Sequence, residues 1–453
     1  MIFSPRLLLR AGARATIAFA TLCILSLGAM RAEATPIERV ISPGGIEAWL
    51  VHEPSVPVIA MDFAFRGGAN QDPAVKPGVA YQVAALLDEG AGEIDGNQFH
   101  QMLQQRAIEL SFRAQRDYFY GSLRLLREHR DQGFDMLRLA LNEPRFENSA
   151  IERIRAQVLT ILRRETTSPN DIATRLWWRT AYPNHPYGRP LNGTLESAAL
   201  IGLEDLRDYK RRVLARDNLK VAVVGDIDAA TLGPALDRIF GALPAKAELT
   251  PVETTMLQGV GQRVAVELDV PQTVLYFGGR GIMRKDPDYV AAFVVNHILG
   301  GGSFSSRLYN EVRDKRGLAY TVSSSINTLD HTALAIVATA TRADRAAESI
   351  SVIEAEIRKL AEHGVTQEEL DKTKSFLKGS YPLRFDTSTK LAGQLLAIQL
   401  EDLGIDYIRR RNSLIDAVTL EDAQRVAKRL FEGGLLVTVV GKSQGVATPN
   451  QGG

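Results

Sequence analysis

Histidine and carboxylate side chains build most hydrolytic metal sites in proteins, and in this chain they are widely spaced. Seven histidines occur in 453 residues, and no two of them lie within five residues of each other. This excludes a helix of the His-x-x-x-His or His-x-x-Glu-His type, although a site built from distant histidines stays open. Asp88 and Glu89 form the most obvious carboxylate pair, but neighbours on a helix point about 100° apart and do not converge. We interpret them as solvated residues at a helix end.

The stretch GVAYQVAALLDEGAG (78–92) has the periodicity of a helix. Tyr81, Ala84 and Ala85 fall at i, i+3 and i+4, so they share one face of that helix. None of these three side chains can act as a general base or a strong metal ligand. Taken alone, the stretch therefore predicts an ordinary core helix.

The most distinctive stretch is LGGGSFSSRLYNEVRDKRGLAYTVSSSI (299–326). Its glycines are not followed by Gly-Lys-Ser/Thr and form no Gly-x-Gly-x-x-Gly, which argues against a phosphate-binding loop. The pattern predicts a loop and then a helix that Ser303 or Ser305 caps and that runs to about Lys315. A turn at Gly317 and a strand LAYTVSSSI are expected to follow.

Arg313 and Tyr320 are the side chains of this stretch that could act on a substrate. We expect them in the last turn of the helix and at the start of the strand. A guanidinium and a phenol can both donate a hydrogen bond to a developing oxyanion. Structural roles fit them as well, since an arginine at a helix C-terminus complements the helix dipole and a tyrosine packs half-buried. Residue types and spacing alone favour the structural roles.

The composition is that of an ordinary folded protein, with 45% hydrophobic and 24% charged residues. The length predicts two to three domains with sizeable cores. The net charge of +1 does not indicate a surface for nucleic acid.

The first 34 residues have the pattern of a secretory signal peptide. Arginines precede an uncharged run (15–30), and Ala-Glu-Ala (32–34) offers a small-x-small cleavage site. The run is shorter than the roughly 20 residues that span a bilayer, so a retained membrane helix is the weaker alternative. Cys23, the one cysteine, lies in this segment, which leaves a mature chain without disulfides or zinc-thiolate sites. We expect secretion across the inner membrane, a periplasmic location in a Gram-negative source, and no stable membrane anchor after cleavage.

Two pairs of segments indicate an internal duplication. Residues 202–228 and 419–444 each begin a helix with Leu-Glu-Asp and end in a strand that closes with Val-Val-Gly. Residues 48–73 and 263–287 each show two strand-like runs, glycines and Asp-Pro, and a helix follows. These repeats predict two related domains at 35–244 and 263–445, a polar linker at 245–262 and a disordered tail at 446–453.

Five stretches resemble the M16 (pitrilysin and insulinase-like) family of zinc peptidases, and the resemblance covers nearly all of the chain after residue 34. They are GVAYQVAALLDEGAG, HPYGRPLNGT (185–194), NLKVAVVGDID (218–228), GGGSFSSRLYNEVRDKRGLAYTV (300–322) and KGSYPLRFDTS (378–388). The resemblance implies an α+β fold of two homologous domains, each a mainly antiparallel sheet flanked by helices. It also implies that two such chains, or four domains, enclose a chamber in which peptides are cut.

The zinc site of the catalytic members is missing from this chain. Their His-x-x-Glu-His motif falls on the first of these stretches, where Tyr81 and Ala85 replace the histidines and Ala84 replaces the glutamate. The third ligand, a Glu, is expected on a later helix, ERIRAQVLTILRRE (152–165). No acidic residue occurs from Arg153 to Arg164, and Ile161 is the best match. Because a hydrolytic zinc needs three protein ligands and an activated water, we expect no metal in this chain and no cleavage by it alone.

The Arg/Tyr pair of the family is present. In the family, this pair comes from the domain that faces the zinc, holds the substrate main chain and stabilises the polarised carbonyl; Arg313 and Tyr320 match it. The resemblance thus implies a non-catalytic subunit that acts on peptides in trans. Its sibling chain would carry His-x-x-Glu-His, the zinc and an edge strand for the peptide. The alternatives are a purely structural subunit, a peptide-binding holdase, and a peptidase with a relocated metal site.

Overall fold

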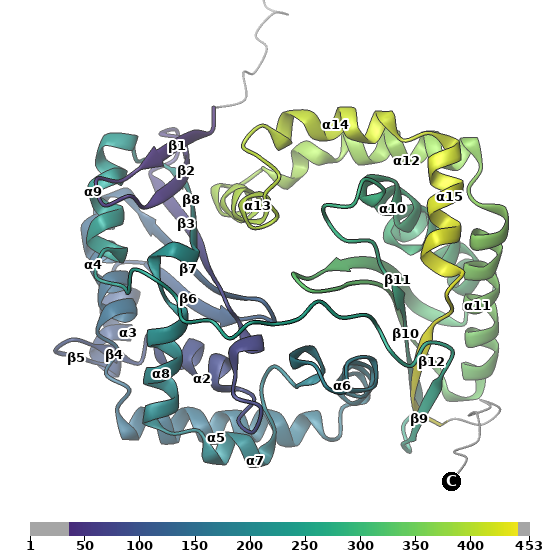
Figure 1. The fold of residues 1–453 in the computed structure, drawn as a ribbon, viewed down its shortest axis with the longest axis horizontal. Coiled ribbons are helices and arrows are strands. Elements are labelled where there is room, and N and C mark those ends of the chain that lie inside the picture. The colour runs from purple at the N-terminus through teal and green to yellow at the C-terminus, as the bar shows by residue number, and fades with distance from the viewer. Residues whose placement is uncertain (1–35, 443–453) are drawn as a thin grey trace, which may run out of the picture. The chain divides into compact units, whose positions relative to one another are not determined.

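The computed structural model describes residues 36–442, which form two similar sheets (Figure 1). The first sheet has the strand order β1-β2-β8-β3-β7-β6. Its neighbouring strands are antiparallel except for β2 and β8, which are parallel. The strands are β1 (Glu38–Ile41), β2 (Glu47–His52), β3 (Val58–Arg66), β6 (Glu109–Ala114), β7 (Tyr118–Leu126) and β8 (Leu219–Gly225).

The second sheet has the order β11-β12-β10-β13-β9, again with one parallel pair, β13 and β9. This is the order of the first sheet without a counterpart of β1, so β9 is an edge strand. The duplication and the α+β fold class expected from the sequence are therefore confirmed. The strands are β9 (Arg263–Glu267), β10 (Gln272–Arg280), β11 (Ala319–Thr328), β12 (Ala333–Arg342) and β13 (Leu436–Gly441).

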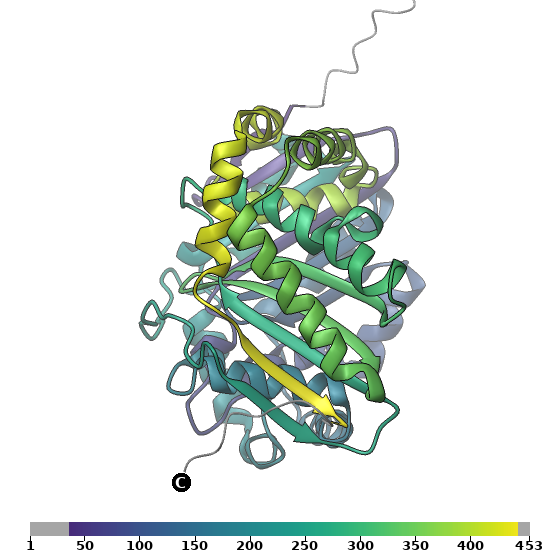
Figure 2. The same cartoon turned by 90° about the vertical axis from the view of Figure 1, so that its right-hand side faces the viewer.

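Helices flank both sheets, and Figure 2 shows α11 and α15 lying over one face of the second sheet. We call the elements before residue 245 the first half and those after residue 262 the second half. A short hairpin, β4 (Gly90–Ala91) and β5 (Ile94–Asp95), follows the first-half helix α2. The first-half helices are α2 (Val79–Leu86), α3 (Gly96–Gln105), α4 (Arg130–Asn142), α5 (Asn148–Glu165), α6 (Pro169–Ala181), α7 (Leu195–Leu200), α8 (Leu203–Val213) and α9 (Ala229–Phe240). The second-half helices are α10 (Tyr289–Asn296), α11 (Ala346–His363), α12 (Gln367–Gly379), α13 (Ser388–Leu400), α14 (Tyr407–Ala417) and α15 (Leu420–Phe431).

The two Leu-Glu-Asp segments begin α8 and α15 through the same local bonds. In each, an aspartate three residues into the segment accepts from the backbone N–H before the helix, Gly202 N to Asp205 Oδ2 at 2.8 Å and Thr419 N to Asp422 Oδ2 at 3.1 Å. These bonds satisfy backbone N–H groups at the helix starts, and at α15 the Thr419 side chain also accepts from the Asp422 N–H, which makes that cap reciprocal. The apolar side chains of both helices then face a sheet and join its core.

One helix from each half packs on the sheet of the other half. Helix α13 packs on β8 and β3 of the first sheet, where Leu395 and Leu396 are buried among Trp49, Val51 and Ala60. Helix α6 packs on β13 and β10 of the second sheet, and Trp177 is fully buried there. The duplication therefore contains an exchange of helices, and the core of each half needs both halves.

Residues 245–262 contain no helix or strand, and they are nevertheless held in place. Leu257 is buried, Thr255 N–H donates to His331 O at 2.9 Å and Gln258 N–H donates to Ala181 O at 3.0 Å. The expected signal peptide and tail lie outside the described residues, and the domain boundaries stay a prediction. No helix within residues 36–442 is long and apolar enough to cross a membrane.

Candidate functional site

Helix α2 is fixed at its N-terminus by a carboxylate that the sequence did not single out. Asp72 accepts from the backbone N–H groups of Gly78 at 2.7 Å and Ala80 at 2.8 Å. These N–H groups belong to the first turn, where no helical carbonyl can reach them. Burial raises the pKa of Asp72 to about 7, although both N–H bonds favour the charged form. Gly78 has φ 100°, a backbone conformation that suits glycine.

The inert face of α2 lies where the sequence places it. Tyr81 and Ala85 are half-buried and Ala84 is buried, while Gln82 and Val83 point into the core. Burial, together with the nearby charge of Glu165, raises the pKa of the Tyr81 phenol. The phenol is therefore protonated at neutral pH, and a neutral phenol is a poor metal ligand.

Glu165, the last residue of α5, is the carboxylate that approaches Tyr81. Its two oxygens are engaged: Arg175 donates to one at 2.6 Å and Asn192 Nδ2 donates to the other at 2.8 Å. Ile161 lies four residues earlier on the same helix face and is half-buried. Glu165 is the last residue of the segment in which a third ligand is expected, and the sequence did not single it out there.

The interpretation of Asp88 and Glu89 as solvated residues is wrong for Glu89, which is buried, while Asp88 is half-buried. Helix α2 ends at Leu86, and the turn that follows buries Glu89, which accepts from the guanidinium of Arg153 on α5. Asp88 instead lies 3.8 Å from His100 Nε2, and burial raises its pKa. The two carboxylates have different partners, so they fasten α2 to its neighbours and form no joint site.

The segment before Arg313 begins later than the sequence predicted. Ser303 has φ 47° and, with Ser305, forms a short 3-10 turn, so neither serine caps the helix. The helical segment starts only at Arg307 and becomes a π-helix over Tyr309–Asp314. A one-residue expansion of this kind is rare and often found at functional sites.

The turn and strand after this segment agree with the sequence. Gly317 has φ 59° and no atom within 4 Å of an added Cβ, so the left-handed conformation is what calls for glycine. Strand β11 follows from Ala319, with Tyr320 as its second residue.

Arg313 and Tyr320 lie against each other. The Arg313 guanidinium carbon is 4.6 Å from the centre of the Tyr320 ring and 4.8 Å from that of Tyr309, and a guanidinium nitrogen donates to the Tyr309 hydroxyl. Two cation–π contacts hold the guanidinium in place. Tyr320 is 79% exposed and Phe304, whose ring is 5.0 Å from that of Tyr309, is 73% exposed. The result is an exposed phenol on the edge strand β11, with an ordered guanidinium from the preceding π-helix beside it.

A buried polar cluster joins the two halves. Asp117, beside β7, accepts from the Tyr187 hydroxyl at 2.5 Å, from Asn70 Nδ2 at 3.0 Å and from the backbone N–H of Asp330 at 3.0 Å. Asp330, between β11 and β12, accepts in turn from the Tyr118 hydroxyl at 2.8 Å. Asp117 is separated from Asp330 by 213 residues, so no local pattern could have revealed this cluster.

The segment HPYGRPLNGT connects this cluster to α2. Its Tyr187 belongs to the cluster, and Arg189 donates to the carbonyl of Asp72 at 2.9 Å. Gly193, at φ 86°, brings its Cα against the carbonyl of Pro77, 2.4 Å from where a Cβ would lie. The motif that suggested a family thus acts as a support for the start of α2.

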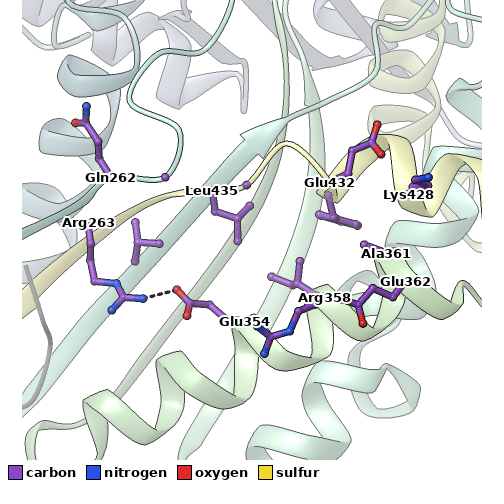
Figure 3. A pocket seen from close by; sticks show the side chains of 14 residues that line it. Gln262, Arg263, Glu354, Arg358, Ala361, Glu362, Lys428, Glu432 and Leu435 are labelled. Atoms are coloured by element: carbon purple, nitrogen blue, oxygen red, sulfur yellow. Dashed lines mark hydrogen bonds and ion pairs between the residues drawn. The ribbon is translucent and has the colours of Figure 1, made fainter. Parts of the chain in front are cut away.

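A groove of about 760 Å³ lies at the open edge of the second sheet, between β9, α11 and the end of α15 (Figure 3). Arg263 and Glu354 point toward each other across it and form an ion pair at 2.6 Å. Lys428 and Glu432 lie along another part of the same rim. The groove shares no residue with the Arg313–Tyr320 pair, so the two surfaces are separate.

Comparison with known proteins identifies the family. The sequence model described as "Insulinase (Peptidase family M16)" matches residues 48–195, and the one described as "Peptidase M16 inactive domain" matches residues 201–377. A protein of Helicobacter pylori named "Non-peptidase homolog YmxG" is 30% identical over 336 residues, 73% of this chain and 77% of that protein. This chain belongs to the M16 family.

Other M16 proteins are similar over most of the chain. A Bacillus subtilis protein named "Uncharacterized zinc protease YmxG" is 22% identical over 410 residues, 90% of this chain and 98% of its own. A crystal structure from Pseudomonas fluorescens, described as a peptidase M16 inactive domain, has a TM-score of 0.85 and 26% identity and covers 91% of this chain and 99% of its own. The family and the fold expected from the sequence are thereby confirmed.

The zinc that the M16 family implies does not fit the residues present. The positions on α2 where the resemblance predicts zinc ligands hold a protonated phenol and alanine, and the nearby carboxylate of Glu165 is bound by Arg175 and Asn192. Within residues 36–442, no group of three or more His, Cys, Asp or Glu side chains could hold a metal ion. No step of a reaction is therefore assigned to a metal in this M16 chain.

Proposed function

We propose that this chain is a non-catalytic subunit of an M16-type zinc metallopeptidase. By itself it cleaves nothing, and a sibling chain with His-x-x-Glu-His supplies the zinc and the general base. The observation that carries this proposal is the contrast between the two halves. Tyr81, Ala84 and Ala85 leave the first half without ligands, whereas Arg313 and Tyr320 stay together and accessible in the second half. The name of the Helicobacter pylori relative, a non-peptidase homolog, is consistent with this assignment.

Arg313 and Tyr320 would bind peptide substrate for the sibling's active site. The exposed Tyr320 hydroxyl can donate a hydrogen bond to the carbonyl oxygen of the scissile peptide bond. This oxygen gains negative charge in the transition state, so the bond would stabilise the transition state more than the bound substrate. Arg313 is restrained by two rings, so little conformational entropy is lost when it binds the main chain of a peptide. Because β11 is an edge strand, an extended peptide can lie beside it and meet both side chains.

The N-terminal sequence supports an extracytoplasmic place of work. Residues 1–34 have the charge pattern and the small-residue site of a secretory signal peptide. We therefore propose that the sibling chain is exported as well and that the two chains meet in the periplasm.

A second candidate is a structural or peptide-binding M16 protein without a catalytic role. The exposed aromatic side chains around Arg313 favour it, since Phe304 and Tyr320 are both more than half exposed. Exposed aromatic side chains in one region are typical of surfaces that bind other chains. In this case the chain would hold extended peptides, and Arg313 and Tyr320 would add affinity only.

The deciding experiment compares the chain alone with the chain plus a His-x-x-Glu-His sibling from the same genome. We expect less than stoichiometric zinc by elemental analysis and no cleavage of an unstructured peptide by the chain alone. The mixed complex should cleave the peptide, and a chelator should stop it. Stoichiometric zinc with chelator-sensitive cleavage by the chain alone would overturn the proposal. A stable complex whose rate equals that of the sibling alone would favour the second candidate.

A further inference from the structure

A cavity of about 190 Å³ lies between α10, α13, α14 and the short turn Tyr381–Arg384. These helices occupy the upper part of the second half in Figure 1. Three arginines line the cavity, Arg284, Arg384 and Arg411, together with a single carboxylate, Glu401. We call this space the arginine cavity. It shares no residue with the Arg313–Tyr320 pair, so the inference below is independent of the proposed function.

The one carboxylate that lines the arginine cavity, Glu401, forms an ion pair with Arg284. Glu401 Oε2 lies 2.6 Å from Arg284 Nε, and the Tyr407 hydroxyl is 2.9 Å from another nitrogen of the same guanidinium. Arg284 also stacks on Tyr289, with its guanidinium carbon 4.2 Å from the ring centre. The charge of Arg284 is thus neutralised and its side chain is fixed by these contacts. The charges of Arg384 and Arg411 are not balanced by Glu401.

Arg411 is one of these two, and it is almost completely buried. Its exposure is 7%, and its guanidinium carbon lies 4.0 Å from the centre of the Tyr381 ring. One nitrogen donates to the carbonyl of Leu377 at 3.1 Å and, more weakly, to the side chain of Asn412 at 3.4 Å. Burial lowers the pKa of Arg411, yet a guanidinium keeps its proton at neutral pH.

No carboxylate within residues 36–442 forms an ion pair with Arg411 or with Arg384, which is exposed. A buried cation without a counter-ion is costly, because the charge loses water and gains no opposite charge. Carbonyl and ring contacts offset this cost only in part. An anion that enters the cavity would complete the coordination of Arg411.

The remaining wall of the arginine cavity combines Gln394 and three tyrosines with a larger number of apolar side chains. Val290, Phe293, Ile398 and Leu414 line it on the side of the three packed helices. A free phosphate would leave this wall against water, whereas a ligand with an apolar tail would cover it. The cavity is also smaller than the roughly 300–1,000 Å³ of sites for drug-sized ligands, which limits the ligand to about the size of an amino acid.

We propose that the arginine cavity binds a carboxylate that carries a small apolar group. A planar carboxylate can accept two parallel N–H bonds from one guanidinium, and Arg411 is the arginine that is free to make them. Two sources share this chemistry: the C-terminal residue of a peptide and a free aliphatic acid. Binding of either would join α13, α14 and the turn at Tyr381.

The test is calorimetric titration of the full chain with matched pairs of ligands. N-acetyl-leucine represents a peptide C-terminus, its amide N-acetyl-leucinamide lacks only the charge, and hexanoate represents a free aliphatic acid. We expect at least one acid to bind and the amide to bind about tenfold more weakly or worse, as the loss of a charge-assisted pair implies. The tighter of the two acids identifies the source. No binding of either acid, equal binding of acid and amide, or equal binding of inorganic phosphate would each overturn the proposal.

Two variants locate the binding. Arg411→Gln should weaken the acid about tenfold, and Arg384→Gln should weaken it by a smaller factor of about three, because an exposed charge is screened by water. Arg411→Gln also loses the bond to Leu377 and can unfold, so Arg384→Gln, which breaks no ion pair, is the second variant. Arg409→Gln is the matched control, since Arg409 is exposed on the same helix and does not line the cavity. Unchanged affinity in Arg384→Gln and in folded Arg411→Gln would contradict the proposal.

Discussion

Trp177, in a helix of the first half, donates its indole N–H to the carbonyl oxygen of Leu436, in a strand of the second half, at 3.1 Å. The ring is fully buried against Gly278 of β10, where an added Cβ would lie 2.0 Å from a ring carbon. Gly278 is a glycine because Trp177 occupies the place of its side chain. The exchange of helices between the halves thus rests on a specific contact, and it can be tested.

Gly278→Ala should destabilise the protein by about 1–3 kcal/mol or more, because the methyl group forces the Trp177 ring out of its position. The measurement is the midpoint of urea unfolding, followed by tryptophan fluorescence. Gly379→Ala is the control, since no atom lies within 4 Å of its added Cβ and its φ is not positive. Equal midpoints for the two variants would contradict the packing described here.

Asp72 should make stability depend on pH in the direction opposite to most carboxylates. Its pKa is raised from 3.8 to about 7 by burial, so the folded state holds its proton more tightly than the unfolded state. The stability that this provides is complete below about pH 4 and is lost as the pH rises through 7. The Asp72→Asn variant has no titrating group at this position. The difference between its unfolding temperature and that of the wild type should therefore increase in favour of the variant as the pH rises from 4 to 8.

Asp228→Asn is the control for this titration. Asp228 caps α9, and its bonds to Thr231 lower its pKa, so it is already charged throughout the range from pH 5 to 8. The difference between that variant and the wild type should stay constant there. A constant difference for Asp72→Asn as well would show that Asp72 is charged in the folded protein.

Tyr187→Phe should cost about 1–3 kcal/mol, because it removes a donor from the buried carboxylate of Asp117. Tyr182→Phe, which removes only a hydroxyl bond to Thr332 at 3.0 Å, should cost less. Thermal unfolding of Tyr182→Phe, Tyr187→Phe, Asp117→Asn and the double variant Asp117→Asn/Tyr187→Phe measures the coupling between Asp117 and Tyr187. We expect the double variant to be more stable than the sum of the single effects, since two residues of one network are removed together. Additive effects would mean that the hydroxyl and the carboxylate act separately.

Tyr320→Phe should lower kcat of the complex with a zinc-bearing sibling by about 10²-fold with little change in KM, as expected for a donor that acts in the transition state. Arg313→Ala should raise KM as well, because it binds the main chain. Arg342→Ala serves as control, since Arg342 is exposed and pairs only with Asp344. If Tyr320→Phe turns over at the wild-type rate, the proposed role in trans is wrong.

The sequence predicted those features of the molecule that depend on local pattern. The repeated Leu-Glu-Asp helices, the strands within the two repeats and the turn at Gly317 all have short-range signals, namely caps, apolar runs and a glycine with positive φ. The predicted start of the helix before Arg313 was wrong by a few residues, because Ser303 and Ser305 belong to a separate 3-10 turn and the helical segment begins only at Arg307.

Features that depend on distant residues had no such signal. Glu89 looked like a solvated carboxylate, since nothing nearby in sequence shows that Arg153 meets it in the folded chain. The same holds for Asp72 above α2 and for the arginine cavity, whose walls come from four separate segments. An amphipathic pattern also does not show which sheet a helix covers, so the exchange of α6 and α13 could not be predicted from the sequence.

The exchange of α6 and α13 has a consequence for a protein made of one half alone. Such a chain would expose one face of its sheet and carry a helix with nowhere to pack. It would become stable only by pairing with a second copy, each copy lending its helix to the other. The chain described here has the arrangement of such a dimer with exchanged helices, and residues 245–262 are the linker that joins the two halves covalently. Proteolytic cleavage within residues 245–262 should therefore leave two fragments that stay associated.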